Sequence, residues 1–132
     1  MRWGDGMTKA QALYDFFSSF SIEAWEENSV YSLEEPPAFP YLTYEKRFDS
    51  FGDYDTAISF STWHRSTSWA ASDAKAEEIS AAIGRGGTIM HIDGGYLLIM
   101  RGSPFAQSLG DPSDDMIKRK LFNITVRFYT NN

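Results

Sequence analysis

The chain has 132 residues, of which 42% are hydrophobic, 16% aromatic and 23% charged. This composition is too rich in aromatic residues for a disordered chain, and the length suits one domain with a real core but not two. The chain has no cysteine, which excludes disulfides, thiolate zinc sites and cysteine nucleophiles and is compatible with a reducing compartment. We therefore expect a single domain spanning residues 1–132.

The formal net charge is −6 at pH 7. Proteins that bind nucleic acid without sequence preference carry the opposite balance, so we expect no general affinity for phosphate backbones. The longest apolar runs fall far short of a membrane span, and the first six residues lack the apolar stretch of a signal peptide. We expect a soluble, intracellular protein in which residues 1–7 are an N-terminal extension if Met7 is the natural start.

The first predicted element is an amphipathic helix that begins near Thr8. Thr8 and Gln11 have the spacing of a capping box. Apolar residues then follow at helical spacing, namely Leu13, Phe16, Phe17 and Phe20. We interpret this stripe as a face packed on a sheet, although it can also be read as a groove for a partner.

An irregular, extended arm is predicted for residues 22–40. This segment carries five glutamates, followed by Pro36, Pro37 and Pro40, which forbid regular structure and favour a polyproline-like path. The spacing of Pro37 and Pro40 also matches a PxxP peptide ligand, but we favour a stiff lead-in to the next strand.

Two strands and a second helix are predicted after the arm. The strands cover residues 41–48 and 57–63, and in the second strand apolar residues alternate with serines, which is typical of a sheet with one wet face. Ser72 and Asp73 can then cap a helix over residues 72–83, which a glycine follows.

The last part of the chain predicts a hairpin, a long loop and a closing strand. Residues 88–92 and 96–101 flank the turn sequence Asp-Gly-Gly and should pair. Residues 102–115 contain two prolines and show no periodicity, so we expect a long loop there. Strict alternation of apolar and polar residues over 122–129 predicts the closing strand.

Together these elements predict an α+β fold. We expect a single antiparallel or mixed sheet of about four to five strands, with two helices packed on one face.

No catalytic constellation is evident in the sequence. The two histidines, His64 and His91, have no recognisable partner, and the spacing of His91 and Asp93 does not fit a zinc motif. The glycine-rich sequence at residues 84–87 follows a helix and precedes a strand, whereas a phosphate-binding loop needs the reverse order. We therefore assign no catalytic residue, no metal and no cofactor.

The order of features resembles that of the tail terminator (tail completion) proteins of long-tailed siphophages. The features that carry the resemblance are the first helix, the Glu26 to Val30 segment, the Phe39 to Tyr44 strand, Trp63-His64-Arg65-Ser66, the helix after Ser72, the hairpin into Arg101-Gly102, Pro104-Phe105, and the closing Asn123 to Val126 strand. Each motif alone is unspecific, and the resemblance lies in their collinear order from Met7 onward.

The resemblance implies a structural virion protein and not an enzyme. Such proteins form a ring, expected here to be a hexamer, that caps the tail tube, ends tail polymerisation and presents its other face to the head completion protein. The implied location is the virion tail at the neck, and the host cytoplasm during assembly. The genome would pass through the lumen without specific binding, which an acidic lumen would favour by repelling phosphate.

Aromatic residues and arginine dominate the energetics of protein interfaces, which suggests six contact residues. These are Tyr41, Trp63, Trp69, Arg85, Arg101 and Phe105. The alternatives are that Tyr41 and Trp63 belong to the core, that the arginines are plain surface charges, and that Phe105 only pins its own loop.

Three other functions remain open from the sequence. A head completion or connector protein at the neck would look much the same. A small hydrolase or nucleotide-binding enzyme would use His64 or His91. A monomeric adaptor would use residues 36–40 as its peptide ligand.

Overall fold

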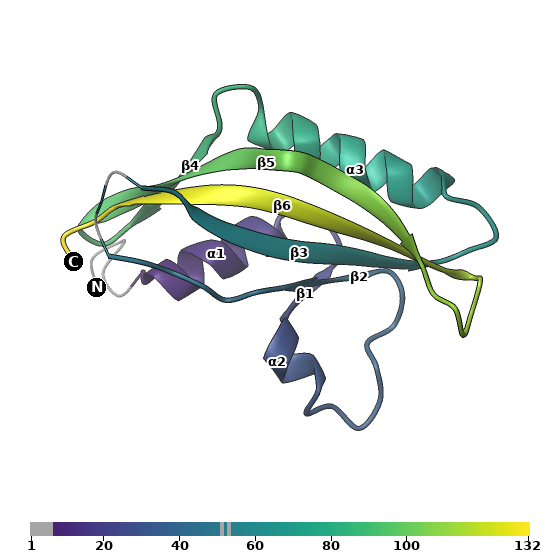
Figure 1. Ribbon diagram of the computed structural model, residues 1–132. Coiled ribbons are helices and arrows are strands. Elements are labelled where there is room, and N and C mark those ends of the chain that lie inside the picture. The colour runs from purple at the N-terminus through teal and green to yellow at the C-terminus, as the bar shows by residue number, and fades with distance from the viewer. Residues whose placement is uncertain (1–6, 51, 53) are drawn as a thin grey trace.

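The protein is described here by a computed structural model over residues 7–50, 52 and 54–132, so residues 1–6 of the predicted extension lie outside the described residues. A single six-stranded sheet has the strand order β1-β2-β3-β6-β5-β4 (Figure 1). The strands are β1 (Glu23–Glu26), β2 (Tyr41–Tyr44), β3 (Thr56–Arg65), β4 (Thr88–Ile92), β5 (Gly95–Gly110) and β6 (Ile117–Tyr129). The helices are α1 (Lys9–Ser18), α2 (Glu27–Val30) and α3 (Ala70–Ile83). The α+β class and the single sheet are confirmed.

The sheet is mixed, because β1 and β2 run parallel while the other four neighbouring pairs of described strands are antiparallel. It has six strands where we expected four to five. The additional strand is β1, which lies inside the predicted arm.

The prediction of an extended arm over residues 22–40 is wrong in its first half. Residues 23–26 pair with β2, and the next four residues form α2. The carboxylate of Glu26 caps this helix, with its Oε2 2.9 Å from the backbone nitrogen of Ser29. The prolines that suggested irregular structure begin only at Pro36, so their effect does not reach this half of the segment.

The long loop predicted for residues 102–115 is also wrong, because β5 continues to Gly110 and pairs with β6. The pairing changes register between Arg101 and Ala106, so Pro104 lies in a bulge of the ladder. A bulge tolerates proline because the residue there has no obligatory hydrogen bond to donate. The real connection is a short turn in which Asp111 accepts a hydrogen bond from the backbone of Ser113 at 2.8 Å.

The two predicted helices are present with one changed boundary. The capping box of α1 is confirmed, since Gln11 N lies 3.1 Å from Thr8 Oγ1 and Thr8 N lies 2.8 Å from Gln11 Oε1. Helix α3 begins at Ala70, so the predicted cap at Ser72 or Asp73 is wrong. Ser72 is instead fully buried within the helix.

The remaining strands follow the predictions closely. The β4–β5 hairpin and the closing strand are confirmed, and β6 begins five residues before the predicted start at 122. Strand β2 is shorter than predicted, since it ends at Tyr44 and not at Phe48.

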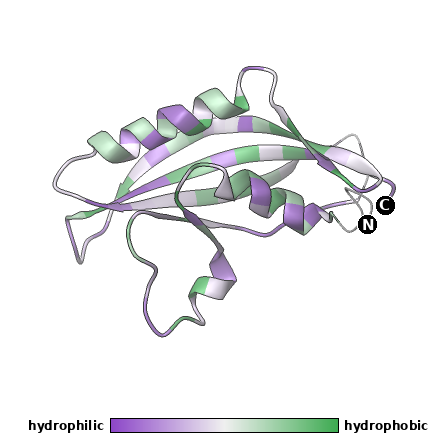
Figure 2. Ribbon diagram, turned by 180° about the vertical axis from the view of Figure 1, so that it is seen from behind, coloured by the Kyte–Doolittle hydropathy of each residue, from purple (hydrophilic) through white to green (hydrophobic). Residues whose placement is uncertain are grey.

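Helices α1 and α3 lie on the same face of the sheet, which we call the core face (Figures 1 and 2). Phe17 of α1 stacks on Tyr44 with ring centroids 4.5 Å apart and lies 5.0 Å from the ring of Phe60. Phe60 in turn stacks on Phe122 at 4.7 Å. Even-numbered residues of β3 and β6 point into this core, as the two-residue period of a strand requires.

Two neighbouring glycines in the turn before β4 are expected to respond differently to alanine. Gly87 has φ +88°, and a Cβ there would lie 2.6 Å from the carbonyl oxygen of Ile99. Gly87→Ala should lower the free energy of unfolding by about 1–2 kcal/mol in urea titrations, because both backbone strain and a steric clash oppose it. Gly86→Ala is the matched control, since a Cβ at Gly86 meets no described atom within 4 Å. Equal effects of the two substitutions would contradict the turn geometry.

Candidate interaction surfaces

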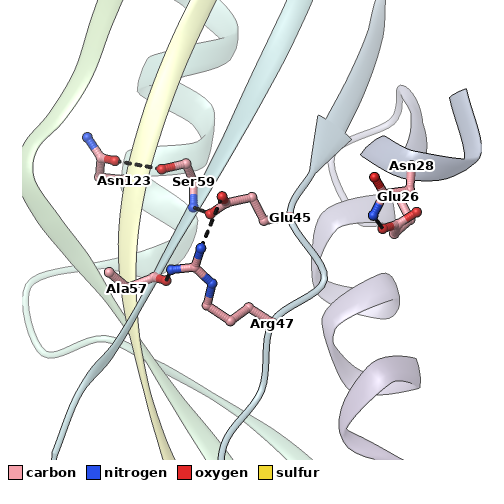
Figure 3. A network of polar contacts seen from close by, with 7 residues as sticks. All are labelled: Glu26, Asn28, Glu45, Arg47, Ala57, Ser59 and Asn123. Atoms are coloured by element: carbon pink, nitrogen blue, oxygen red, sulfur yellow. Dashed lines mark hydrogen bonds and ion pairs between the residues drawn. The ribbon is translucent and has the colours of Figure 1, made fainter. Parts of the chain in front are cut away.

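The face of the sheet opposite to α1 and α3 carries a row of polar side chains, and we call it the uncovered face. It is formed by Tyr41, Thr43, Ser59, Ser61, Trp63, Tyr96, Leu98, Arg119, Leu121, Asn123, Thr125, Arg127 and Tyr129. In its centre, Ser59 Oγ donates to Asn123 Oδ1 at 3.0 Å, and the backbone N–H of Ser59 donates to Glu45 at 2.8 Å (Figure 3). These bonds hold the polar rows in fixed positions.

An aromatic platform lies at one end of the uncovered face, formed by Tyr41, Trp63 and Arg119. Tyr41 and Trp63 are stacked at 6.0 Å with an interplanar angle of 10°. The guanidinium of Arg119 lies 4.7 Å above the Trp63 ring, and Trp63 Nε1 donates to Thr43 Oγ1 at 2.8 Å. Burial raises the pKa of Tyr41. Each member is held by the others, and the accessible part of the platform is formed by the half-buried Trp63 and Arg119, because Tyr41 is only 7% exposed.

The platform brings together two of the six predicted contact residues. Both lie on the face opposite to the helix-covered core, but Tyr41 is only 7% exposed, so the alternative interpretation that it is a buried residue is confirmed for Tyr41. Arg119 was missed because the alternation rule detected β6 only from residue 122 onward.

The other four predicted contact residues lie apart from the platform. Trp69 lies at the start of α3, where the ammonium groups of Lys118 and Lys120 are 5.6 Å and 5.3 Å from its ring. Arg101 donates to Ser80 of α3 at 2.9 Å. Arg85 lies in the turn before β4, and Phe105 packs edge-on against Phe122 with ring centroids 5.4 Å apart. The six residues therefore do not form one surface.

The sheet has two free edges, β1 at one end and β4 at the other. Among the described residues, β1 is paired with no strand but β2, and β4 with no strand but β5. The edges differ in length, sequence and neighbouring helices, because β1 is four residues long and runs into α2 whereas β4 is five residues long and follows α3. Each is a template for an additional strand.

A cavity of about 620 Å³ lies between α3 and the end of β3, and His64 lines it. His64 is only 7% exposed, and its Nδ1 has no hydrogen-bond partner among the described residues. The nearby Lys75 is already engaged, since its ammonium group lies 2.7 Å from the Phe20 carbonyl and 2.9 Å from Glu78. The described residues thus show no histidine–carboxylate pair of the kind that a hydrolase uses.

The stability of the protein is expected to fall below neutral pH because of His64. Burial, and then the charges of Lys75 and Lys120, lower the pKa of His64 from its ordinary value of 6.5. The unfolded chain therefore binds a proton more readily, and stability is lost as the pH falls through 6.5. In urea titrations between pH 7.5 and 5.5, His64→Gln should flatten this dependence, whereas the control His91→Gln should leave it in place. An unchanged slope in His64→Gln would contradict the assignment.

In the described part of the chain, no helix is long and apolar enough to cross a membrane. The described residues also contain no group of three or more histidine, aspartate or glutamate side chains placed to hold a metal ion.

Comparisons of the chain with protein-family models, with curated proteins and with solved structures found no match. The class of the protein is therefore described from its own fold. It is an α+β protein with one mixed sheet, helices on one face, a platform on the other face and two unlike free edges.

Proposed function

We propose that the chain is a tail terminator of a long-tailed phage, a structural virion protein and not an enzyme. In this proposal it forms a ring, of six copies by the resemblance, that caps the tail tube, stops its polymerisation and offers a surface to the head completion protein. The genome passes through the lumen without specific binding, and the net charge of −6 is consistent with a channel to which DNA does not adhere.

The observation that carries the proposal is the presence of two unlike free edges at opposite ends of one sheet. Contacts between two different surfaces of the same chain are heterologous, and heterologous contacts generate rings when the rotation closes. A closed two-fold dimer would instead need a single edge that pairs with itself. The edges therefore support a ring-forming subunit.

The aromatic platform supports a second contact, made by the ring with another protein. Tryptophan, tyrosine and arginine are the residues most often found at the energetic centre of interfaces. Here Tyr41, Trp63 and Arg119 are already fixed by stacking and hydrogen bonds, so little side-chain entropy would be lost on docking. We propose that this platform contacts the tail tube or the head completion protein.

Electron microscopy of the protein incubated with purified tail tubes from the same phage tests the proposal. A ring of density at one tube end, on tubes that no longer elongate, is the expected result. Bare tubes that still grow, together with binding to DNA-filled heads, would instead identify a head completion protein. A variant with His64 replaced by glutamine should cap tubes as the unaltered protein does, because the proposed role does not use this imidazole.

A further inference from the structure

Strand β4 lacks the features that usually keep an edge strand from pairing with another chain. Its sequence, Thr-Ile-Met-His-Ile, has no lysine, no carboxylate and no proline, and the side chain of Ile89 is 49% exposed. The neighbouring edge of β5 is protected, since it contains Pro104 and a shift of register. Natural sheets protect exposed edges with such devices, so an unprotected edge marks a strand that acquires a partner.

The opposite edge, β1, also has space and an unpaired hydrogen-bond donor for an added segment. The indole Nε1 of Trp25 is buried without a hydrogen-bond partner among the described residues. A cavity of about 730 Å³ lies beside this strand, and its lining includes Tyr14, Ile22 and Trp25 together with Glu23 and Glu26. Buried donors in native proteins are almost always paired, so an added segment that supplies an acceptor would complete this edge.

The segment around β1 is strongly acidic, whereas the segment around β4 has a formal charge of only +1 with His neutral. Between residues 10 and 45 there is no lysine, arginine or histidine, and the acids are Asp15, Glu23, Glu26, Glu27, Glu34, Glu35 and Glu45. Between residues 79 and 110 the ionisable side chains other than tyrosine are Arg85, His91, Arg101 and the single acid Asp93. In Figure 1, α2 and the acidic segment after it extend from the side of the sheet that ends in β1, away from β4.

We propose that β4 of one copy adds to β1 of the next copy of this chain, so that the sheet continues from subunit to subunit. Main-chain hydrogen bonds would supply affinity, and the difference in charge between the two edges would set which edges meet. Pairing of β1 with β1 would oppose carboxylates, whereas β4 carries no carboxylate of its own. This inference rests on the proposed ring and specifies the contact that builds it.

The register of the sheet allows a direct test, because the chain has no cysteine of its own. Glu23 is paired with Tyr41, and Ile89 with Leu98, so the side chains of Glu23 and Ile89 both project on the uncovered face. In a continuous sheet they can lie within disulfide distance, whereas Met90 projects on the core face and cannot reach Glu23. Glu23→Cys protein is mixed with mass-tagged Ile89→Cys or His91→Cys protein and oxidised, with Met90→Cys as the matched control.

The expected result is a covalent dimer of the Glu23→Cys variant with the Ile89→Cys or His91→Cys variant, and little or none with Met90→Cys. Dimers of each variant only with itself would overturn the inference, because they show like edges meeting. The same mixtures are oxidised at high concentration without tubes and again on tail tubes. Rings seen on tubes without a 23–89 or 23–91 cross-link in either condition would refute the edge contact and leave the tail terminator proposal standing. Absence of rings on tubes would instead refute the tail terminator proposal. The concentrated sample without tubes would still show whether β4 pairs with β1.

Charge reversal provides an independent measurement. The side chains of Glu23 and Arg85 make no hydrogen bond or ion pair with the described residues, so their replacement should not disturb the fold. Glu23→Arg and Arg85→Glu should each weaken self-association roughly tenfold, because each reduces the difference in charge between the two meeting edges. The controls Glu77→Arg and Lys46→Glu change the net charge equally at exposed sites elsewhere and should have little effect. Equal weakening by the controls would contradict the contact.

Discussion

Replacement of Phe17 with alanine is expected to lower the free energy of unfolding by about 3–5 kcal/mol. The side chain is fully buried and stacks against Tyr44 and Phe60, so it joins α1 to the central strands. Because a domain of this size has a total stability of about 5–15 kcal/mol, this single change removes a large part of it. Urea denaturation followed by circular dichroism measures the loss.

The control for this prediction is Tyr14→Ala on the same helix. Tyr14 is 50% exposed, and substitutions at such positions change stability by about 0.5 kcal/mol or less. A loss below about 1 kcal/mol for Phe17→Ala would show that α1 does not pack on the sheet as described.

The second large effect is expected at the ion pair between Lys120 and Asp73. The ammonium of Lys120 lies 2.5 Å from Asp73 and 3.0 Å from Ser108, and its side chain is only 8% exposed while that of Asp73 is 62% exposed. Asp73→Ala should lower the free energy of unfolding by about 2–3 kcal/mol, because it leaves a buried ammonium without its counter-charge. The loss is smaller than for a fully buried pair, since the side chain of Asp73 is largely exposed.

A double-mutant cycle separates this effect from the general role of Asp73 at the start of α3. Lys120→Met keeps the apolar stem and removes the charge, so it should change stability by less than about 1 kcal/mol. In the Lys120→Met background, Asp73→Ala should then cost only about 0.3–1 kcal/mol, the contribution of an acid in the first helical turn. The same cost in both backgrounds would show that the pair does not interact.

Local signals in the sequence identified most of the regular elements. Thr8 and Gln11 predicted the start of α1 because a capping box is complete within one helical turn. The hairpin of β4 and β5 followed from the turn residues between them, and Gly94 has the positive φ that such a turn requires. The errors occurred where pairing with a distant strand decided the structure. Strand β1 depends on its contact with β2, and the second half of β5 depends on β6.

The candidate interaction surfaces were harder to predict from the sequence than the fold was. Tyr41 and Trp63 were singled out as aromatic residues, but their stacking follows from the register between β2 and β3. Arg119 joins them from β6, more than fifty positions further along the chain, and no local pattern indicates that encounter. The unprotected edge of β4 likewise became evident only when the strand order placed β4 at the end of the sheet.

The sequence by itself determined the α+β class, the amphipathic helix after Thr8, the final hairpin and closing strand, and the segregation of acidic residues into the first third of the chain. These properties depend on spacing, turn chemistry and composition, which act over a few residues. Only the tertiary structure decided that six strands form one sheet, that the acidic segment and β4 lie at its opposite edges, and that Tyr41, Trp63 and Arg119 form a platform. These properties depend on long-range strand pairing, whose register is set by burial of one face of the whole sheet.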